Sequence, residues 1–520
     1  MILKLSYKIT EDYKNAFLQN RKAILIFFIL TLISTLSTFN MANYLHPEME
    51  IIIFILVMIL GIFCILYYKI HNTELHKVAF VVILCFGLVF AFLSPMLIIP
   101  DEFEHFTHSE ITSRGELFPE YVTASKEVPS WDGNHFQGYR TIGSVLDFAW
   151  NDGNTVFNVD FDNKPINESY ILYTSSFAHN PPYGYFAQAF GVFLAKLFDL
   201  NAIWLLWLGR AFNLVLYASL IALSVKKAPV LKVPIMAIAC LPIIVMQGAS
   251  MSIDSMSNGL GFLIFSFFLS MLKSGENSVG LKDIAIFTLL TILIALCRTP
   301  YLAFIFLLLF IPIKNYKTKF YYLFLFIICA SAVCLLWSQL YSVPTYYNSF
   351  RIDHALKSNI NMTNQISFMT THLPETMFTL IQIPKSIGIH FNTLFIYSFH
   401  PYEYTSEFLN LICPILLCGI IFLYPYKNDF KIKTRVLTFL ILALIYYGIN
   451  IIQFLTWTPV GDFKEILGVS VRYFIPLMPF LPFVFNLNNN ESSAKIDDLI
   501  IIAAIFILAS VCALTAVKYY

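Results

Sequence analysis

Apolar runs long enough to cross a lipid bilayer recur along the chain, and they constrain the fold more than any other feature. About 18 or more consecutive apolar residues suffice to span the ~30 Å of bilayer hydrocarbon as a helix. The run at 51–68, "IIIFILVMILGIFCILYY", is one example. Charged residues make up 12% of the chain, whereas soluble domains carry roughly a quarter. The sequence therefore predicts an all-α fold of the polytopic membrane class.

We expect about 13 membrane-spanning helices, near 23–42, 50–68, 78–97, 203–224, 231–249, 257–272, 284–297, 300–313, 320–340, 406–424, 436–456, 471–486 and 498–516. The segment 181–199 is also apolar, but it begins with two prolines and contains Gln188 and Lys196. Short cytoplasmic loops carry an excess of Lys and Arg. The basic clusters at 226–232 and 427–435 fall in such loops only if 181–199 does not span. We therefore predict an amphipathic helix in the outer membrane interface there.

The alternation of spans and loops divides the chain into five parts. They are a cytoplasmic segment with the first three spans (1–97), a large extracytoplasmic loop (98–202), a helix bundle (203–340), a second extracytoplasmic loop (341–405) and the C-terminal spans (406–520). The pattern predicts a multi-pass protein of the cell membrane, with a cytoplasmic N-terminus and an extracytoplasmic site. We find no internal repeat with matching halves, which disfavours a carrier built from inverted repeats.

The stretch "IIPDEFEHFTHSE" at 98–110 places ionisable residues directly after the third span. A helix that begins at its proline would carry Asp101, Glu104, His105 and His108 on one face, with Glu102 beside it. Such a cluster can act as a general base, hold a divalent cation or bind a hydroxyl-bearing substrate. Proline and aspartate followed by glutamate are also typical of a helix start, in which Asp101 caps free N–H groups and Glu104 reaches back. Both interpretations stay open at this point.

Other polar residues stand at the expected outer ends of spans. Asp254 lies between two spans, Arg298 ends one and Arg472 begins a late one. Arg210 lies within a span, where an unpaired charge is costly, and Asn258 follows the Asp254 loop. A single arginine at a span end commonly snorkels to the interface. Together, these residues predict an outer cleft with acids from two loops and arginines from two others, which suits a phosphate group.

Several sequence blocks resemble a bacterial membrane-protein family that is catalogued as a domain of unknown function and regarded as related to the GT-C glycosyltransferases. The blocks occur in the same order: "PDEFEHF", "HNPPYGYFAQAFG", "LGRAFNLVLY", "QGASMSIDSMSNGLGFL", "CRTPYLAFIFLLLFIP" and "WTPVGDFKEILGVSVRYFIPLMP". The resemblance runs from about Pro95 to Pro482, and its most specific part is the proline–Asp–Glu–x–x–His block at 100–105.

The resemblance implies a GT-C-like architecture with an active site at the outer leaflet. Enzymes of that superfamily take a sugar from a polyprenyl-phosphate carrier and pass it to an acceptor. The match implies that Asp101 is the general base and that Glu102 and His105 orient the acceptor or bind a cation. Arg298 and Arg472 would neutralise the leaving phosphate. Three predicted spans precede the motif in this chain, whereas a single span usually precedes it in GT-C enzymes. The helices therefore do not correspond one to one.

The resulting hypothesis is an integral membrane glycosyltransferase. Its expected partners are a polyprenyl-phosphate-linked sugar, a glycan or lipid-linked acceptor and membrane lipid, and nothing indicates nucleic acid. The candidate cofactor is a divalent cation, Mg²⁺ or Mn²⁺, with Glu104 and His108 as candidate ligands. The candidate substrate-binding residues are Asp254, Arg298, Arg472, Tyr183, Arg210 and Asn258.

Two alternatives stay open. A polymerase or ligase of lipid-linked oligosaccharides would use much the same residues. A transporter or lipid flippase without bond chemistry predicts ionisable residues near the bilayer midplane and paired broken helices.

Overall fold

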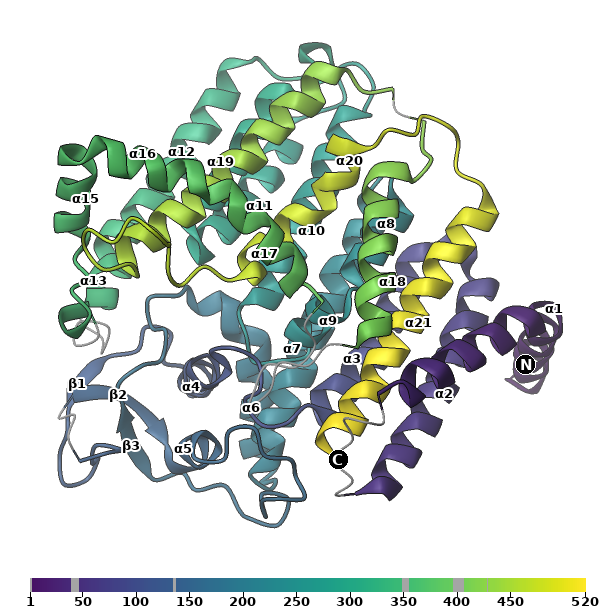
Figure 1. Cartoon of the computed structure of the whole chain (residues 1–520), viewed down its shortest axis with the longest axis horizontal. Helices are drawn as coiled ribbons and strands as arrows, with labels where there is room; N and C mark the ends of the chain where they lie inside the picture. The colour runs from purple at the N-terminus through teal and green to yellow at the C-terminus, as the bar shows by residue number, and fades with distance from the viewer. Residues whose placement is uncertain (1, 39–45, 134–136, 348–354, 396–405, 428) are drawn as a thin grey trace.

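The computed structural model describes residues 2–38, 46–133, 137–347, 355–395, 406–427 and 429–520 (Figure 1). Eight of the described helices are long and apolar enough to cross a membrane. They are α1 (Ile2–Leu36), α2 (Pro47–Ile70), η2 (Asn72–Glu74) with α3 (Leu75–Leu93), α7 (Ile203–Lys227), α10 (Asp254–Leu272), α12 (Tyr321–Trp337) with η6 (Ser338–Ser342) and α13 (Val343–Tyr347), α19 (Ile432–Thr456), and α21 (Ala494–Tyr519). The structure is 71% helical, so the protein is a helical membrane protein with several spans.

The other predicted spans are present as shorter or interrupted helices. They are α8 (Lys232–Ala239) and α9 (Pro242–Gly248), α11 (Leu281–Cys297), η4 (Thr299–Phe310), α18 (Glu407–Cys418) with η8 (Gly419–Leu423), and η9 (Val471–Phe480) with α20 (Leu481–Phe485). A 3₁₀ helix rises about 2.0 Å per residue, so the 12 residues of η4 extend roughly 24 Å. The expected count of 13 depends on these segments, and the end of the first predicted span, 39–42, lies outside the described residues.

The last helix, α21, lies inside the bundle. Of the residues in the most apolar part of α21, 89% are buried inside the protein. In the corresponding part of α1, 17% of the residues are buried. Helix α21 packs against α1, α2 and α3. Asp498 of α21 accepts hydrogen bonds of 2.6 Å from both Tyr68 and Lys69 at the end of α2. At the other end of α21, the Tyr520 hydroxyl donates to the carbonyl of Leu93 at 3.0 Å.

A layer of short elements covers one end of the bundle (Figure 1). It contains α4 (Glu102–Ser113), β1 (Tyr121–Thr123), β2 (Gln137–Ile142), α5 (Gly143–Ala149), β3 (Tyr170–Tyr173), η3 (Pro182–Tyr185) and α6 (Phe186–Leu197). The strands form an antiparallel sheet in the order β1-β2-β3, in which Tyr139 of β2 pairs with Tyr121 and Tyr173. This sheet was not predicted from the sequence, because its strands are short and lie in a polar segment. The fold is therefore helical with a small added sheet.

Helix α6 lies within the segment predicted to be interfacial rather than spanning. Its 12 residues extend about 18 Å, too short to cross the hydrocarbon. One side of α6 packs against α4 and α7. Large apolar side chains remain exposed on the other side, namely Phe186, Phe190, Phe193 and Leu197. This is the geometry expected of a helix that rests in the membrane interface.

Gly191 allows the backbones of α6 and α7 to touch. A Cβ atom at Gly191 would fall 2.5 Å from the carbonyl carbon of Leu208 and 2.7 Å from the amide nitrogen of Gly209. We expect Gly191→Ala to destabilise the protein by about 1–3 kcal/mol, because neither backbone can move aside without losing packing. Thermal unfolding in detergent, followed by scanning fluorimetry, measures the effect. The control is Gly388→Ala, where the added Cβ meets nothing within 4 Å. Equal melting temperatures for the two variants would contradict the prediction.

A second group of short elements lies on the side of the bundle, near α13 and α19 (Figure 1). It consists of α15 (Met362–Thr371), α16 (Leu373–Gln382), η7 (Ile383–Lys385) and α17 (Ser386–Thr393). The short helix η5 (Ile313–Asn315), between η4 and α12, is not part of this group. This group falls within the predicted second loop, of which 348–354 and 396–405 lie outside the described residues. The irregular segment 457–470, between α19 and η9, packs against it, and the two together form a cavity.

Candidate functional site

Four charged side chains meet where four helices begin. Asp101 directly precedes α4, Asp254 is the first residue of α10, Arg298 directly precedes η4 and Arg472 is the second residue of η9. We call these four residues the charged cluster. The N-terminal end of a helix carries partial positive charge, which favours carboxylates and disfavours arginines unless they are paired. The pairing of arginines with carboxylates in the cluster is therefore what this arrangement of helix ends requires.

Arg472 is the centre of the charged cluster. Its Nη2 atom is paired with Asp101 Oδ2, its Nη1 donates to the carbonyl of Pro100 at 2.7 Å, and its Nε lies 3.4 Å from Asp254 Oδ2. The second carboxylate oxygen of Asp254 lies 3.4 Å from Arg298 Nη2. The fold thus brings together the side chains of four predicted site residues that are distant in the chain.

The outer residues of the charged cluster, Asp101 and Arg298, are partly exposed to solvent, whereas the central residues, Arg472 and Asp254, are buried. The side chains of Asp101 and Arg298 are 38% and 25% exposed, whereas those of Arg472 and Asp254 are 6% and 3% exposed. The Arg298 guanidinium lies over the Tyr473 ring, 3.6 Å from its centroid. An incoming molecule can therefore reach one carboxylate and one guanidinium, each held in place by a buried neighbour.

The geometry contradicts the helix-cap interpretation of Asp101. Asp101 occupies the N-cap position of α4, but its side chain makes no capping hydrogen bond to the helix. The carboxylate pairs with Arg472 instead. Its backbone is left-handed, with φ of 61°, a conformation that costs roughly 1–2 kcal/mol for most residues and is tolerated best by glycine, asparagine and aspartate. Strained backbone of this kind is common at functional sites.

Glu102 and Arg210 form a separate, buried ion pair. Arg210 Nε and Nη2 donate to the two oxygens of Glu102 at 2.8 and 2.7 Å. The remaining Arg210 donors bind the carbonyls of Ala91, Ser94 and Pro95, at 2.9–3.2 Å. Glu102 Oε1 also accepts from the amide of Met251 at 3.0 Å. Both side chains are fully committed inside the protein, which corrects the assignments of Glu102 as catalytic and of Arg210 as substrate-binding. They are positioning residues that fix α4 against α3 and α7.

His105 lies between the charged cluster and a buried tyrosine. Asn180 Nδ2 donates to the Tyr185 hydroxyl at 2.8 Å, and that hydroxyl lies 2.8 Å from His105 Nδ1. Among the described residues Tyr185 has no other acceptor, so its proton goes to Nδ1 and the imidazole carries its own proton on Nε2. Burial lowers the pKa of His105 to about 3, against the opposing effect of the nearby Asp254 carboxylate. His105 is therefore a neutral hydrogen-bond donor.

The candidate metal ligands do not come together. His108 Nδ1 donates to the carbonyls of Ser176 and Phe177 at 3.0 and 3.2 Å, and its ring stacks on Tyr185 at 4.0 Å. Glu104 is half-buried on the same helix. Within the part of the chain that the structure describes, no group of three His, Cys, Asp or Glu side chains could hold a metal ion. The residues present do not fit the expected divalent cation, and no step below uses one.

Tyr183 and Asn258 belong to the packing of helices. The Tyr183 hydroxyl donates to the carbonyl of Leu293 in α11, and Asn258 donates to the side chain of Gln247 in α9 at 3.0 Å. Asn258 is fully buried. Both are therefore corrected from substrate-binding to structural residues.

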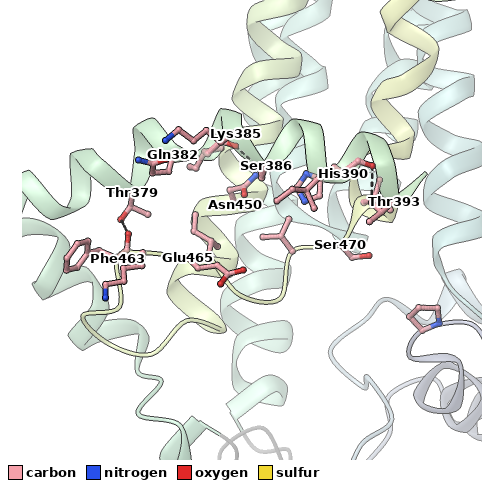
Figure 2. Close-up of a pocket in the computed structure, with 17 residues that line it drawn as sticks. Thr379, Gln382, Lys385, Ser386, His390, Thr393, Asn450, Phe463, Glu465 and Ser470 are labelled. Atoms are coloured by element: carbon pink, nitrogen blue, oxygen red, sulfur yellow. Dashed lines mark hydrogen bonds between the residues drawn. The ribbon is translucent and has the colours of Figure 1, made fainter. Parts of the chain in front are cut away.

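A cavity of about 580 Å³ lies beside the charged cluster, a size within the range of small-molecule sites. Its lining includes Pro100 and Val471, the chain neighbours of Asp101 and Arg472. Figure 2 shows the polar side chains of the lining, which come from α16, η7, α17 and α19 and from the segment 463–470. They are Thr379, Gln382, Lys385, Ser386, His390, Asn450, Glu465 and Ser470.

These polar lining residues were not predicted from the sequence. They lie in the predicted second loop, in α19 and in the segment after α19, and none of the site residues predicted from the sequence lines the cavity. The available signal was the spacing of Ser386, His390 and Thr393, which places three polar residues on one face of a short helix. That spacing is common, and only the fold shows that this face meets the segment 463–471 across a cavity.

Comparison with known proteins gives one match. A family model described as "Predicted membrane protein (DUF2142)" matches residues 84–481. No curated protein and no solved structure matches the chain. The matched region contains the charged cluster and the cavity. It leaves out α1, α2 and α21, which pack against one another.

Proposed function

This chain belongs to the DUF2142 family of predicted membrane proteins, and we propose that it is a membrane glycosyltransferase of GT-C-like architecture. It moves a sugar from a polyprenyl-phosphate donor to a hydroxyl group of a glycan or lipid-linked acceptor, at the outer face of the cell membrane. One observation carries the proposal: the charged cluster lies next to a cavity of about 580 Å³ whose lining includes several polar side chains. Transfer from a lipid phosphate needs a base, cations for the leaving group and room for a sugar, and these are the groups that the fold gathers.

Asp101 is the proposed general base. It is the more exposed of the two carboxylates in the charged cluster, and Arg472 fixes its orientation. The carboxylate takes the proton of the acceptor hydroxyl, and the acceptor oxygen attacks the anomeric carbon of the donor sugar. The bond from that carbon to the phosphate oxygen breaks, and its electron pair leaves with the lipid phosphate. The attack comes from the side opposite the phosphate, so the configuration at the anomeric carbon inverts.

Arg298 is the proposed partner of the leaving phosphate. Its guanidinium is partly exposed and lies over the ring of Tyr473, so its N–H groups can face an anion. Positive charge fixed in advance near a developing negative charge stabilises the transition state more than the ground state. Asp254 and Arg472 are the buried side chains that hold the two reacting residues apart, so the base and the cation do not neutralise each other directly.

Transport is the alternative from another class, and the position of Arg210 argues against it. A transporter requires ionisable groups near the bilayer midplane. Arg210 donates to the carbonyls of Ser94 and Pro95 at the end of α3, so its charge lies at the same end of the bundle as the charged cluster.

Mass spectrometry of the cell-surface glycan, with and without the gene, tests the proposal. We expect loss of the gene to remove one decorating sugar while the length of the glycan is retained, and we expect the wild-type gene to restore that sugar. A shortened glycan would instead favour the polymerase or ligase alternative. An unchanged glycan, or a complete lipid-linked precursor retained on the inner face, would contradict sugar transfer.

A further inference from the structure

Three side chains form a hydrogen-bonded row along the wall of the cavity. Ser386 and His390 come from α17 and line the cavity (Figure 2), and Tyr446 comes from α19. The Tyr446 hydroxyl lies 2.7 Å from Ser386 Oγ and 3.0 Å from His390 Nδ1. Ser386 Oγ also donates to the carbonyl of Ile383 at 2.7 Å. The proposed mechanism uses none of these groups.

Only one arrangement of protons satisfies all three hydrogen bonds. A carbonyl cannot donate, so the single proton of Ser386 points at Ile383. The bond between the two hydroxyls must then use the proton of Tyr446. Since Tyr446 has no second proton, the bond between Tyr446 and His390 must use a proton on Nδ1. A neutral imidazole carries one proton, so Nε2 of His390 is left with a lone pair and is a hydrogen-bond acceptor.

The imidazole of His390 is fixed in position by aromatic neighbours. Its centroid lies 4.9 Å from that of Phe474 and 6.0 Å from that of Tyr446. In the part of the chain that the structure describes, the imidazole makes its hydrogen bond through Nδ1 and none through Nε2, and the side chain is half-buried in the lining of the cavity. A fixed acceptor without a partner in the lining of a cavity is suited to a donor on a bound molecule, and a hydroxyl group is the donor that a sugar supplies.

We infer that His390 is a hydroxyl-recognition residue, in which Nε2 accepts a hydrogen bond from a sugar hydroxyl of the acceptor, with Tyr446 and Ser386 as positioning residues that hold the required tautomer. The inference rests on the proposed function for the identity of the substrate. It assigns the cavity to the acceptor and leaves the donor phosphate to Arg298. The acceptor hydroxyl that reacts lies at the Asp101 side of the cavity, next to Pro100, and the hydroxyl bound by His390 is a different one.

Acidification should weaken this contact. Burial lowers the pKa of His390 below its usual 6.5, so Nε2 keeps its lone pair at neutral pH and loses it only as the pH falls through the lowered value. The other titratable groups that face the cavity are Lys385 from η7 and Lys464 and Glu465 from the segment after α19, and Tyr446 contacts the imidazole itself.

Chemical modification tests the inference without relying on sugar transfer. Diethyl pyrocarbonate reacts with an unprotonated imidazole nitrogen, and mass spectrometry locates the product. We expect modification of His390 in the full chain in nanodiscs, and at least threefold slower modification when one member of a panel of methyl glycosides is added. His372 is the control, since it lies on the same group of helices, is exposed and does not line the cavity. Protection of neither histidine, or of both equally, would overturn the inference.

Paired substitutions separate recognition from a structural role. The amide of asparagine can replace Nδ1 and that of glutamine can replace Nε2, so we expect His390→Asn to raise the KM for the acceptor about three- to tenfold and His390→Gln to restore part of the loss. Neither should change kcat as Asp101→Asn does. Equal KM values for the two variants and wild type would overturn the inference. If transfer is absent but glycosides protect His390, the proposed function fails and sugar recognition stands.

Discussion

Asp101→Asn is expected to lower kcat for sugar transfer by about 10²–10⁴-fold, the usual contribution of a general base. The amide cannot accept the proton of the acceptor hydroxyl at neutral pH. Removing the negative charge also leaves Arg472 less neutralised, so the lipid phosphate should bind at least as tightly as before. We therefore expect kcat to fall while KM for the donor is unchanged or lower. Steady-state kinetics with purified protein in nanodiscs separates the two constants.

The substitution should leave the fold intact, because asparagine tolerates the left-handed backbone that Asp101 adopts. Asp199→Asn is the matched control. Asp199 also has a left-handed backbone, with φ of 47°, and is exposed. Both variants should reach the membrane in wild-type amounts. If Asp101→Asn retained kcat within threefold of wild type, Asp101 would only neutralise Arg472, and the base would have to be another group.

Arg210→Met should reduce stability by about 3–5 kcal/mol, the usual result of leaving a buried charge without its partner. Glu102 would keep a single donor among the contacts described above, the amide of Met251. The carbonyls of Ser94 and Pro95, which turn the chain from α3 toward α4, would lose their donors as well. The measurement is thermal unfolding in detergent together with the yield of monodisperse protein.

The double variant Glu102→Leu with Arg210→Met distinguishes an unpaired charge from lost packing. Replacing both members of a buried ion pair with apolar residues is often neutral or stabilising, so we expect it to recover much of the stability that the single variant loses. Conversely, a single variant that melted at the wild-type temperature would mean that Arg210 is not committed to Glu102, and substrate binding would again be a candidate role.

The predicted helices and the residues of the charged cluster depend on information that is local in the sequence. Apolar runs fix where helices form, because burial in lipid requires about the same length in every one. The cluster residues could be named because each stands where an apolar run ends, and the ends of neighbouring spans meet on one side of a membrane. The helix ends did not reveal which arginine pairs with which acid.

Asp101 and Glu102 show why pairing could not be predicted. They are adjacent, yet Asp101 precedes α4 and meets Arg472, whereas Glu102 begins the helix and points to Arg210. A single step along the backbone at a helix start turns the side chain to another direction, so the two acids have different surroundings and different roles. The three-stranded sheet and the cavity depend on segments that are distant in sequence, and no local pattern specifies how these meet.

The enclosed position of α21 has a consequence for biogenesis. Ribosomes deliver the chain from its N-terminus, so α21 enters the bilayer after every other helix of the structure. Until then, the sides of α1, α2 and α3 that α21 covers have no contact with it. Tyr68 and Lys69 likewise lack their hydrogen bonds to the carboxylate of Asp498. Assembly of the N-terminal spans is thus completed only when α21 has been inserted, and a nascent chain halted before α21 would lack the contacts of α21 with these spans.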